Sequence, residues 1–267
     1  MKTLGLIQPA WLSNIITVLP IGQHFHRLGY QVLWPVMGNL YEQLREVAPE
    51  IKWCPTTCVA GQAVPAATRL VADCDKLLNL ATHFMGNEQL TADYQDSGLI
   101  LDAWKYKKAR VPFKEKYVLH LQKPHQTNVN DDYCVACATN EWLSLCRSQL
   151  PSMRVIDLWV DHQPNIFKMM DLIQNAKGIA TTDNAICRLV NQMGWSYKWQ
   201  VLLGELNPTY TLSDEWHTCY DILSDTHASA KMVVADMQPG STVGNYSGGD
   251  SKIHQVFNEV VDETNNG

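Results

Sequence analysis

The sequence of 267 residues contains no apolar run that approaches the roughly 20 residues needed to span a bilayer. Its start, MKTLGLIQPAW, lacks the long apolar core and the cleavage site of a secretory signal peptide. We therefore expect a soluble, cytoplasmic protein. The first expected strand leads into IQPAWLSN without a GxGxxG pattern, which argues against a nicotinamide-dependent oxidoreductase. No internal repeat is detectable in the sequence.

Charge and composition limit the binding partners and the number of domains that we expect. The net charge of −6 argues against a general nucleic-acid binder, although local basic patches remain compatible with it. With 46% hydrophobic residues, a chain of this length can bury roughly 70–75% of its unfolded surface. This is enough for one large domain or two small ones, and we expect two.

The eight cysteines are scattered through apolar stretches, which predicts reduced thiols in a chain without an export signal. Cys134 and Cys137 form a CxxC, and Cys54 and Cys58 form a CxxxC, so a zinc site with four thiolates is conceivable. The alternative is that the CxxC lies in a buried strand, where residues three apart point to opposite faces. We expect the strand and no metal.

Residues 155–193 show the clearest alternation of strand and helix patterns in the sequence. An apolar run is followed by a polar loop, a stretch with helical spacing, a second apolar run and a second helical stretch. In an α/β chain this order predicts parallel strands joined by right-handed crossovers. A ligand at such a sheet binds beyond the carboxyl ends of the strands.

Two loops are therefore expected to meet at one sheet edge, residues 159–165 and residues 181–184. The second loop opens a helix, whose N–H groups and partial positive charge suit a phosphate. We expect this helix to aim its free N–H groups into a gap between two halves of the molecule. The alternative is that Thr182, Asp183 and Asn184 only cap the helix, as such residues do at most helix starts.

The N-terminal half shows the same alternation of strand and helix. Apolar runs predict strands at residues 3–7, 31–34 and 76–82, with a short one near Trp53. Helical patterns, the first capped by Ser13, predict helices at residues 14–28, 41–47 and 98–109. Residues 35–39 and 85–97 are expected to be loops, the latter holding Asp93 and Asp96.

A polar stretch at residues 116–132 predicts a linker and a domain boundary. We divide the chain into residues 1–122 and 123–267. In the second part, strands are expected at residues 133–138, 199–203 and 231–235. Helices are expected at residues 141–150, from Ser213 through Tyr220, and at residues 252–261.

Two segments, LIQPAWLSNIITVLPIGQHFHRLGYQVLWPV and KGIATTDNAICRLVNQMG, resemble glycosyltransferases of the GT-B fold. The likeness is to the heptosyltransferase-like group and to small bacterial or phage relatives, which LDAWKYKKARVPFKEKY also resembles. The positions that match the motifs of this group are Leu19, Pro20, Gly29, Tyr30, Asp183, Asn184 and Leu189.

The resemblance implies an α/β protein with two Rossmann-like domains that face each other across a cleft. The second domain would hold a nucleotide-sugar donor as co-substrate, and the first an acceptor, with no metal or other cofactor. We expect donor contacts from Thr139, Asn140, Trp159, Asp161, His162, Thr182, Asp183 and Asn184. Asp161 and His162 are equally compatible with solvated loop residues.

One position departs from the pattern of the group. Its members carry an Asp after the first glycine-containing loop as general base on the acceptor hydroxyl, and the matching place here reads Ser13, Asn14. An amide cannot take a proton at neutral pH. Either His83 or Asp102 is the base, or the reaction retains configuration without a conventional base, or the chain is a non-catalytic nucleotide or sugar binder. His83 is also compatible with a hydrogen-bonded histidine at a strand end.

A basic cluster stands out in this acidic protein, and its members are Lys105, Lys107, Lys108, Arg110, Lys114 and Lys116. One interpretation is a solvated helix face. The other is contact with a phosphate-bearing acceptor, such as the hydroxymethylated pyrimidines of phage DNA, through the cluster together with Trp104 and Tyr106. We therefore expect acceptor contacts from Ser13, Asn14, Trp104, Lys105 and Lys108.

Overall fold

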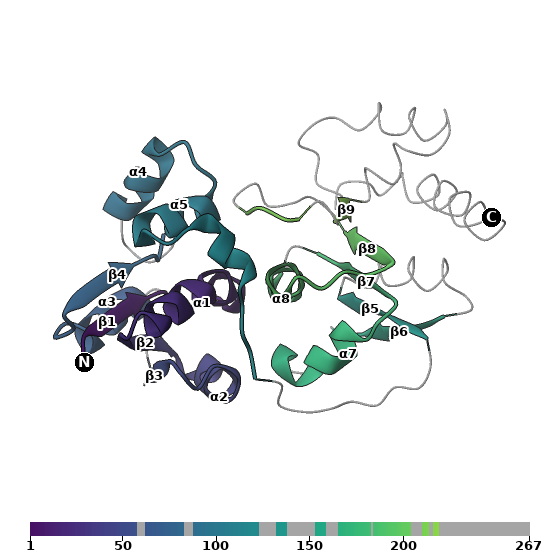
Figure 1. Cartoon of the computed structure of the whole chain (residues 1–267), viewed down its shortest axis with the longest axis horizontal. Coiled ribbons are helices and arrows are strands. Elements are labelled where there is room, and N and C mark those ends of the chain that lie inside the picture. The colour runs from purple at the N-terminus through teal and green to yellow at the C-terminus, as the bar shows by residue number, and fades with distance from the viewer. Residues whose placement is uncertain are drawn as a thin grey trace.

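Two parallel β-sheets form the framework of the computed structural model (Figure 1). The structure describes residues 1–57, 62–82, 88–122, 132–137, 153–158, 165–182, 184–203, 210–213 and 216–218. The first sheet has the strand order β3-β2-β1-β4, and the second the order β6-β5-β7-β8-β9. Every strand pair in the described part of the chain is parallel, so the expected α/β class with parallel sheets is confirmed.

The first sheet is built from strands that alternate with helices. Its strands are β1 (Thr3–Ile7), β2 (Gln31–Met37), β3 (Lys52–Thr56) and β4 (Lys76–Asn79). Its helical segments are α1 (Leu12–Arg27), α2 (Gly38–Val47), α3 (Ala63–Leu70), α4 (Glu88–Asp96), α5 (Leu101–Ala109) and the 3-10 helix η2 (Phe113–Tyr117). The chain moves from β1 outward to β3 and then returns to the far side of β1 to add β4, as right-handed crossover connections allow.

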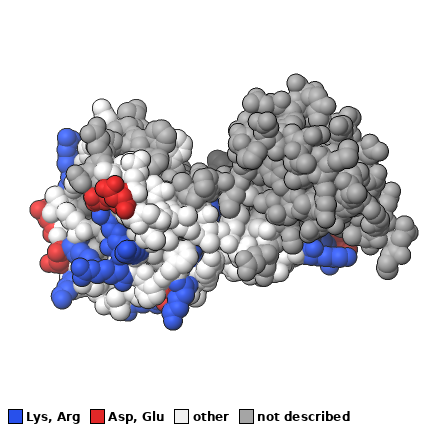
Figure 2. All heavy atoms as spheres, turned by 90° about the horizontal axis from the view of Figure 1, so that it is seen from above, with Lys and Arg blue, Asp and Glu red and all other residues white. Residues whose placement is uncertain are grey.

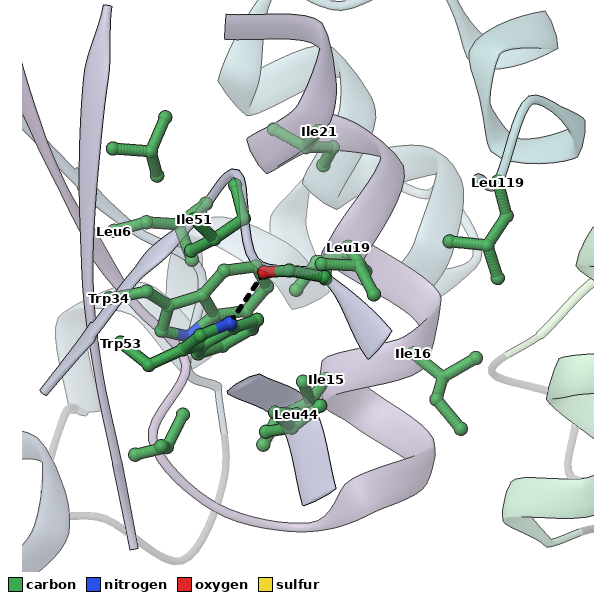
Figure 3. Packing of buried hydrophobic residues seen from close by; sticks show 14 of the residues in the cluster. Leu6, Ile15, Ile16, Leu19, Ile21, Trp34, Leu44, Ile51, Trp53 and Leu119 are labelled. Atoms are coloured by element: carbon green, nitrogen blue, oxygen red, sulfur yellow. Dashed lines mark hydrogen bonds between the residues drawn. The ribbon is translucent and has the colours of Figure 1, made fainter. Parts of the chain in front are cut away.

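The core of this half lies between the first sheet and α1. Trp34 of β2 and Trp53 of β3 lie side by side with ring centroids 4.9 Å apart, and Leu19 of α1 packs close to them (Figure 3). Both indole N–H groups are satisfied, because Trp34 donates to the carbonyl of Gln8 at 3.1 Å and Trp53 donates to that of Ala48 at 2.8 Å.

The second sheet contains β5 (Tyr133–Cys137), β6 (Arg154–Asp157), β7 (Gly178–Thr181), β8 (Trp199–Leu202) and β9 (His217–Thr218). Its helices are η3 (Ile166–Met169), α7 (Met170–Gln174) and α8 (Ala185–Met193). Central β5 and β7 are buried along their whole length, which explains why their sequences are continuous apolar runs.

The two halves meet where α8 packs along α1, near the middle of the molecule in Figure 1. Leu189, Phe167 and Met170 of the second half belong to the same apolar cluster as the core of the first half. The side-chain amide of Gln192 donates to the carbonyl of Thr17 at 3.0 Å. The junction is therefore a packed contact with its own buried hydrogen bonds.

Several expected boundaries were wrong. Helix α1 begins at Leu12, before Ser13, since the Trp11 carbonyl already accepts the N–H of Ile15 at 3.0 Å. Strand β2 continues through Pro35 to Met37. The missing N–H of Pro35 is tolerated there because the register of β2 with β1 ends at Leu33, before the proline.

Two further elements differ in type. The expected loop at residues 85–97 contains helix α4, which therefore carries Asp93 and Asp96. The expected helix after Ser213 is absent from the described residues there, because His217 and Thr218 pair with β8 as strand β9. The strand predicted at residues 231–235 and the helices predicted at residues 141–150 and 252–261 lie outside the described residues. Across the described ranges, none of the helices is sufficiently long and apolar for a membrane span.

Candidate active site

The topology of each sheet points to one place where a ligand can bind. In the first sheet the strand order reverses between β1 and β4, and in the second it reverses between β5 and β7. Loops that follow these strands diverge, and the carboxyl edge at such a switch point is the usual ligand position in open α/β sheets. The loops concerned begin at Gln8 after β1 and at Thr182 after β7.

After β1, a buried polar network closes the sheet edge. Gln8 is only 1% exposed, and its side-chain oxygen accepts a hydrogen bond from Nζ of Lys105 at 3.0 Å. The Gln8 carbonyl is the acceptor for Trp34. Burial lowers the pKa of Lys105 from 10.5 to about 7, an effect that the negative charge of Asp102 partly opposes. The amine of Lys105 is thus held away from solvent by the neutral side-chain amide of Gln8.

Two residues just beyond this network, Trp11 and Asn14, lie at the start of α1. Trp11 has a φ of 64°, a left-handed backbone conformation, and its side chain is 54% exposed. Asn14, one helical turn further on, accepts a hydrogen bond through its side-chain oxygen from the hydroxyl of Tyr210 in the second half. The start of α1 therefore lies beside the point where the second half reaches across.

Asp102 lies at the centre of a second link between the halves. Its carboxylate is fully buried and accepts from Nζ of Lys116 at 2.5 Å and from the backbone N–H of Thr211 at 2.9 Å. Lys116 Nζ also donates to the carbonyl of Thr211 at 2.5 Å. Burial lowers the pKa of Lys116, while its ion pair with Asp102 acts in the opposite direction. In this arrangement Asp102 orders the 210–213 segment and exposes no oxygen to an acceptor.

Helix α8 begins with a side-chain cap, and this corrects the expectation of open N–H groups. Oδ1 of Asn184 accepts from the backbone N–H groups of Ile186 at 2.9 Å and Cys187 at 3.2 Å. Two N–H groups of the first turn are thereby used within the helix. Arg188, four residues after Asn184, brings a full positive charge to the same region. Its guanidinium is buried and lies 3.7 Å from the ring centroid of Tyr210.

The basic cluster is not one solvated face. Lys105 and Lys116 are each about 1% exposed, and both bind partners inside the protein. Lys108 lies 3.7 Å from the carboxylate of Asp93 and over the ring of Trp104, which is itself buried. The exposed members are Lys107, Arg110 and Lys114. Figure 2 shows the blue Lys and Arg side chains of this half with red carboxylates among them.

The two cysteines of the CxxC are buried thiols, whereas Cys54 and Cys74 are only partly buried. Cys134 and Cys137 both lie in β5, and burial raises the pKa of each thiol, that of Cys134 to about 11. Cys54 is a free thiol in β3, and Cys58 lies outside the described residues. In the described part of the chain, no three His, Cys, Asp or Glu side chains cluster as a metal site would require.

The structure brings together part of the expected set. Ser13 and Asn14 lie at the start of α1, and Thr182 and Asn184 at the start of α8. The expected residues outside the described ranges are His83, Thr139, Asn140, Trp159, Asp161, His162 and Asp183. The sequence reading did not single out Gln8, Trp11, Arg188, Tyr210 and Thr211. Two of these residues carry a sequence signal that could have identified them. Gln8 directly follows the first strand, and Arg188 lies four residues after a helix cap.

No protein-family model matches the sequence, and no curated protein matches it either. Solved structures do resemble the fold. The iron-containing dodecameric glycosyltransferase TibC from enterotoxigenic E. coli H10407 aligns over 100% of this chain and 79% of its own, with 12% identity and a TM-score of 0.57. TibC in complex with ADP-D-beta-D-heptose aligns over 99% of this chain and 76% of its own, with 10% identity and a TM-score of 0.57.

E. coli ADP-heptose LPS heptosyltransferase II aligns over 99% of this chain and 100% of its own, with 13% identity and a TM-score of 0.52. The likeness thus extends over nearly the whole of this chain and over about three quarters or more of each matched chain. It agrees with the two parallel sheets and their switch points. The chain has the GT-B fold of the heptosyltransferases.

Proposed function

We propose that this protein is a glycosyltransferase that moves a sugar from a nucleotide-sugar donor to an acceptor hydroxyl. The observation that carries the proposal is the pairing of two parallel sheets, each with a switch point, through the contact of α1 with α8. The helices that carry the proposed acceptor residues (α1) and donor residues (α8) are therefore in contact. The resemblance noted in the sequence implies a matching division, with an acceptor on the first half and a donor on the second.

The donor diphosphate is proposed to bind at the start of α8. Thr182, Asp183 and Asn184 lead into the helix. Because Asn184 occupies two N–H groups of the first turn, we propose that the positive charge of Arg188 attracts the diphosphate instead. A guanidinium suits a diphosphate because it presents several donors in a fixed plane. It would stabilise the negative charge that develops on the leaving group as the bond to the sugar breaks.

The remaining donor contacts come from the loops on either side. Thr139 and Asn140 follow β5, the strand that adjoins β7 at the switch point. Trp159, Asp161 and His162 follow β6, and we propose that they contact the base and ribose. TibC has been solved with ADP-D-beta-D-heptose, so an ADP-sugar is the first donor to test.

The acceptor is proposed to approach Ser13 and Asn14, at the start of α1. Asn14 is held by the Tyr210 hydroxyl and can orient an acceptor hydroxyl but cannot take its proton. His83 is our candidate for the general base, because it follows β4, the neighbour of β1 at the switch point. The buried ion pair of Asp102 gives that residue a positioning role instead.

A saccharide acceptor is preferred over modified DNA. Trp104 and Lys105 are buried and Lys108 is paired with Asp93, so the three residues of this region that we expected to contact an acceptor are engaged within the protein. The exposed cations of the cluster are Lys107, Arg110 and Lys114. Transfer to hydroxymethylated phage DNA that falls steeply with added salt would reverse this preference, since phosphate contacts are strongly salt-dependent.

The second candidate function is a non-catalytic nucleotide or sugar binder of the same fold. It is favoured by one observation, the amide of Asn14 at the position where the resemblance leads one to expect a carboxylate. To separate the two, the full chain is incubated with ADP-, UDP-, GDP- and TDP-sugars, and release of the nucleoside diphosphate is measured. A transferase hydrolyses one donor slowly even without acceptor. Thermal stabilisation by a nucleotide with no release from any donor supports the binder and contradicts the transferase.

The base assignment has its own test. His83→Ala should lower the donor turnover that depends on acceptor while leaving nucleotide affinity within about twofold. His120→Ala, an exposed histidine in the first half, is the matched control. Equal turnover for both variants would contradict the role of His83.

A further inference from the structure

The first exposed residue after β1 is a tryptophan in an unusual backbone conformation. Residues 4–10 are buried without interruption, and Trp11 then emerges with 54% of its surface exposed. Its φ of 64° is uncommon for any residue with a side chain and is a strained choice for a bulky one. Glycine would adopt this conformation freely, so the indole is present at a conformational cost.

The position of Trp11 is fixed from both sides. The carbonyl of Pro9 accepts the N–H of Met37 at 2.9 Å, and the carbonyl of Trp11 accepts that of Ile15 at 3.0 Å. The residue is therefore the rigid corner between β1 and α1, at the switch point of the first sheet. Asn14, one turn along, is bonded to Tyr210 of the second half. An exposed aromatic ring on a backbone corner that is hydrogen-bonded on both sides, one turn from the junction, is well placed to contact a ligand.

We propose that Trp11 is a stacking platform for a pyranose ring of the acceptor, a specificity residue that no comparison assigns. The face of an indole carries partial negative charge and attracts the partly positive C–H face of a sugar ring. Asn14 lies one helical turn from Trp11 and Ser13 lies between them, and both carry polar groups that can hydrogen-bond sugar hydroxyls. The inference rests on the proposed transferase function and names its acceptor class.

A nucleobase would also stack on an indole, but the surroundings favour a saccharide. The whole chain carries a net charge of −6, and Lys105, the cationic side chain bound to the loop after β1, is buried against Gln8. A nucleic acid would need exposed cations along the path of its backbone.

The test uses the full chain labelled with [15N]tryptophan, in which nine indole N–H signals are expected. The Trp11 signal is assigned by its absence from the Trp11→Phe variant. The methyl pyranosides of glucose, galactose and mannose are then added at millimolar concentrations. We expect at least one to shift the Trp11 signal saturably while the signals of buried Trp34 and Trp53 stay in place.

Two variants sharpen the test. Trp11→Ala should weaken binding of that pyranoside about tenfold and leave ADP affinity unchanged, because the ring stacks on sugar only. Leu70→Ala removes another exposed apolar side chain, 51% exposed at the end of α3, and should leave both affinities unchanged.

The outcomes separate this inference from the proposed function. If no pyranoside shifts the Trp11 signal, or if an oligothymidylate shifts it instead, the stacking platform is overturned whatever the nucleotide result. If pyranosides shift it but no nucleotide or nucleotide sugar binds, the platform stands and the transferase proposal fails.

Discussion

The carboxylate of Asp102 accepts the backbone N–H of Thr211 at 2.9 Å, across 109 positions of sequence. Lys116 completes the arrangement by bonding both the carboxylate of Asp102 and the carbonyl of Thr211. All three groups belong to the junction between the two sheets. A single buried charge pair thus joins α5, η2 and the segment that leads to β9.

Replacing Asp102 by Asn should destabilise the protein by about 3–5 kcal/mol, because a buried Lys116 is left without its counter-charge. The measurement is the free energy of unfolding in urea. The matched control is Glu42→Gln, which disrupts the exposed pair with Arg45 and should cost less than about 1 kcal/mol. Equal losses for the two variants would show that the buried pair is not a structural link.

The buried amine of Lys105 predicts a particular pH dependence of stability. Its pKa is about 7 in the folded protein and 10.5 ordinarily, so between these values the unfolded chain binds more protons. The free energy of unfolding contributed by this group therefore rises with pH above about 7, by up to roughly 1.4 kcal/mol per pH unit. Below pH 7 both states are protonated, and the cost of burying the charge is fully present.

The comparison that isolates Lys105 is with Lys105→Met. The difference in unfolding free energy, wild type minus variant, should increase between pH 7 and pH 8.5, because cysteine and tyrosine ionisation is common to the two proteins and cancels. Urea unfolding at three pH values provides the measurement. A difference that stays constant over this range would contradict the lowered pKa.

Arg188 should matter for the donor and Lys198 should not. Arg188→Met is expected to weaken ADP binding about 10- to 100-fold, because the proposed diphosphate contact is charge-assisted. Lys198 is an exposed lysine shortly after the same helix, and Lys198→Met should change ADP affinity less than twofold. Isothermal titration calorimetry with ADP measures both. Circular dichroism checks that the buried substitution leaves the fold intact, and unchanged affinity in a folded Arg188→Met protein would remove this contact from the proposal.

Gly5 in the middle of β1 should not tolerate a side chain. A Cβ there would lie 2.5 Å from Cβ of Val71 and 2.9 Å from a methyl group of Leu77, so Gly5→Ala should cost about 1–3 kcal/mol through overpacking. Gly38→Ala is the control, since its nearest contact is the Thr56 carbonyl at 3.4 Å. Thermal unfolding of both variants provides the comparison, and a neutral Gly5→Ala would mean that α3 can shift.

Trp11→Gly should raise the free energy of unfolding by about 1 kcal/mol, since glycine adopts a φ of 64° without strain. The same variant should lose pyranoside binding. Stabilisation with loss of binding is the pattern expected of a strained functional position. A destabilised Trp11→Gly would show that the indole contributes to packing.

The strands could largely be predicted from the sequence, and the reason is their burial. Residues 3–7 match β1 as observed, because central parallel strands are buried on both faces and read as continuous apolar runs. Helix α4 was missed because its sequence, EQLTADYQD, is mostly polar. Its stability comes from tertiary packing, as Leu90 and Tyr94 lie against Trp104 of α5.

The candidate site was harder to predict, because its side chains are defined by partners far along the chain. Lys105 and Lys116 look like a solvated basic stretch in the sequence, and only their partners Gln8, Asp102 and Thr211 explain their burial. The start of α8 was located correctly. Whether its N–H groups were open could not be read from the sequence, since the same Asn184 can cap the helix or serve a ligand.

The packing of α8 against α1 has a consequence for how the chain can be divided. Leu189, Phe167 and Met170 complete an apolar layer that begins with residues of the first sheet and α1. A fragment ending at residue 122 would expose that apolar layer to solvent, so it should aggregate and be poorly soluble when expressed alone. The two halves should unfold together in a single thermal transition. Fragments produced separately should regain the native structure only when they associate.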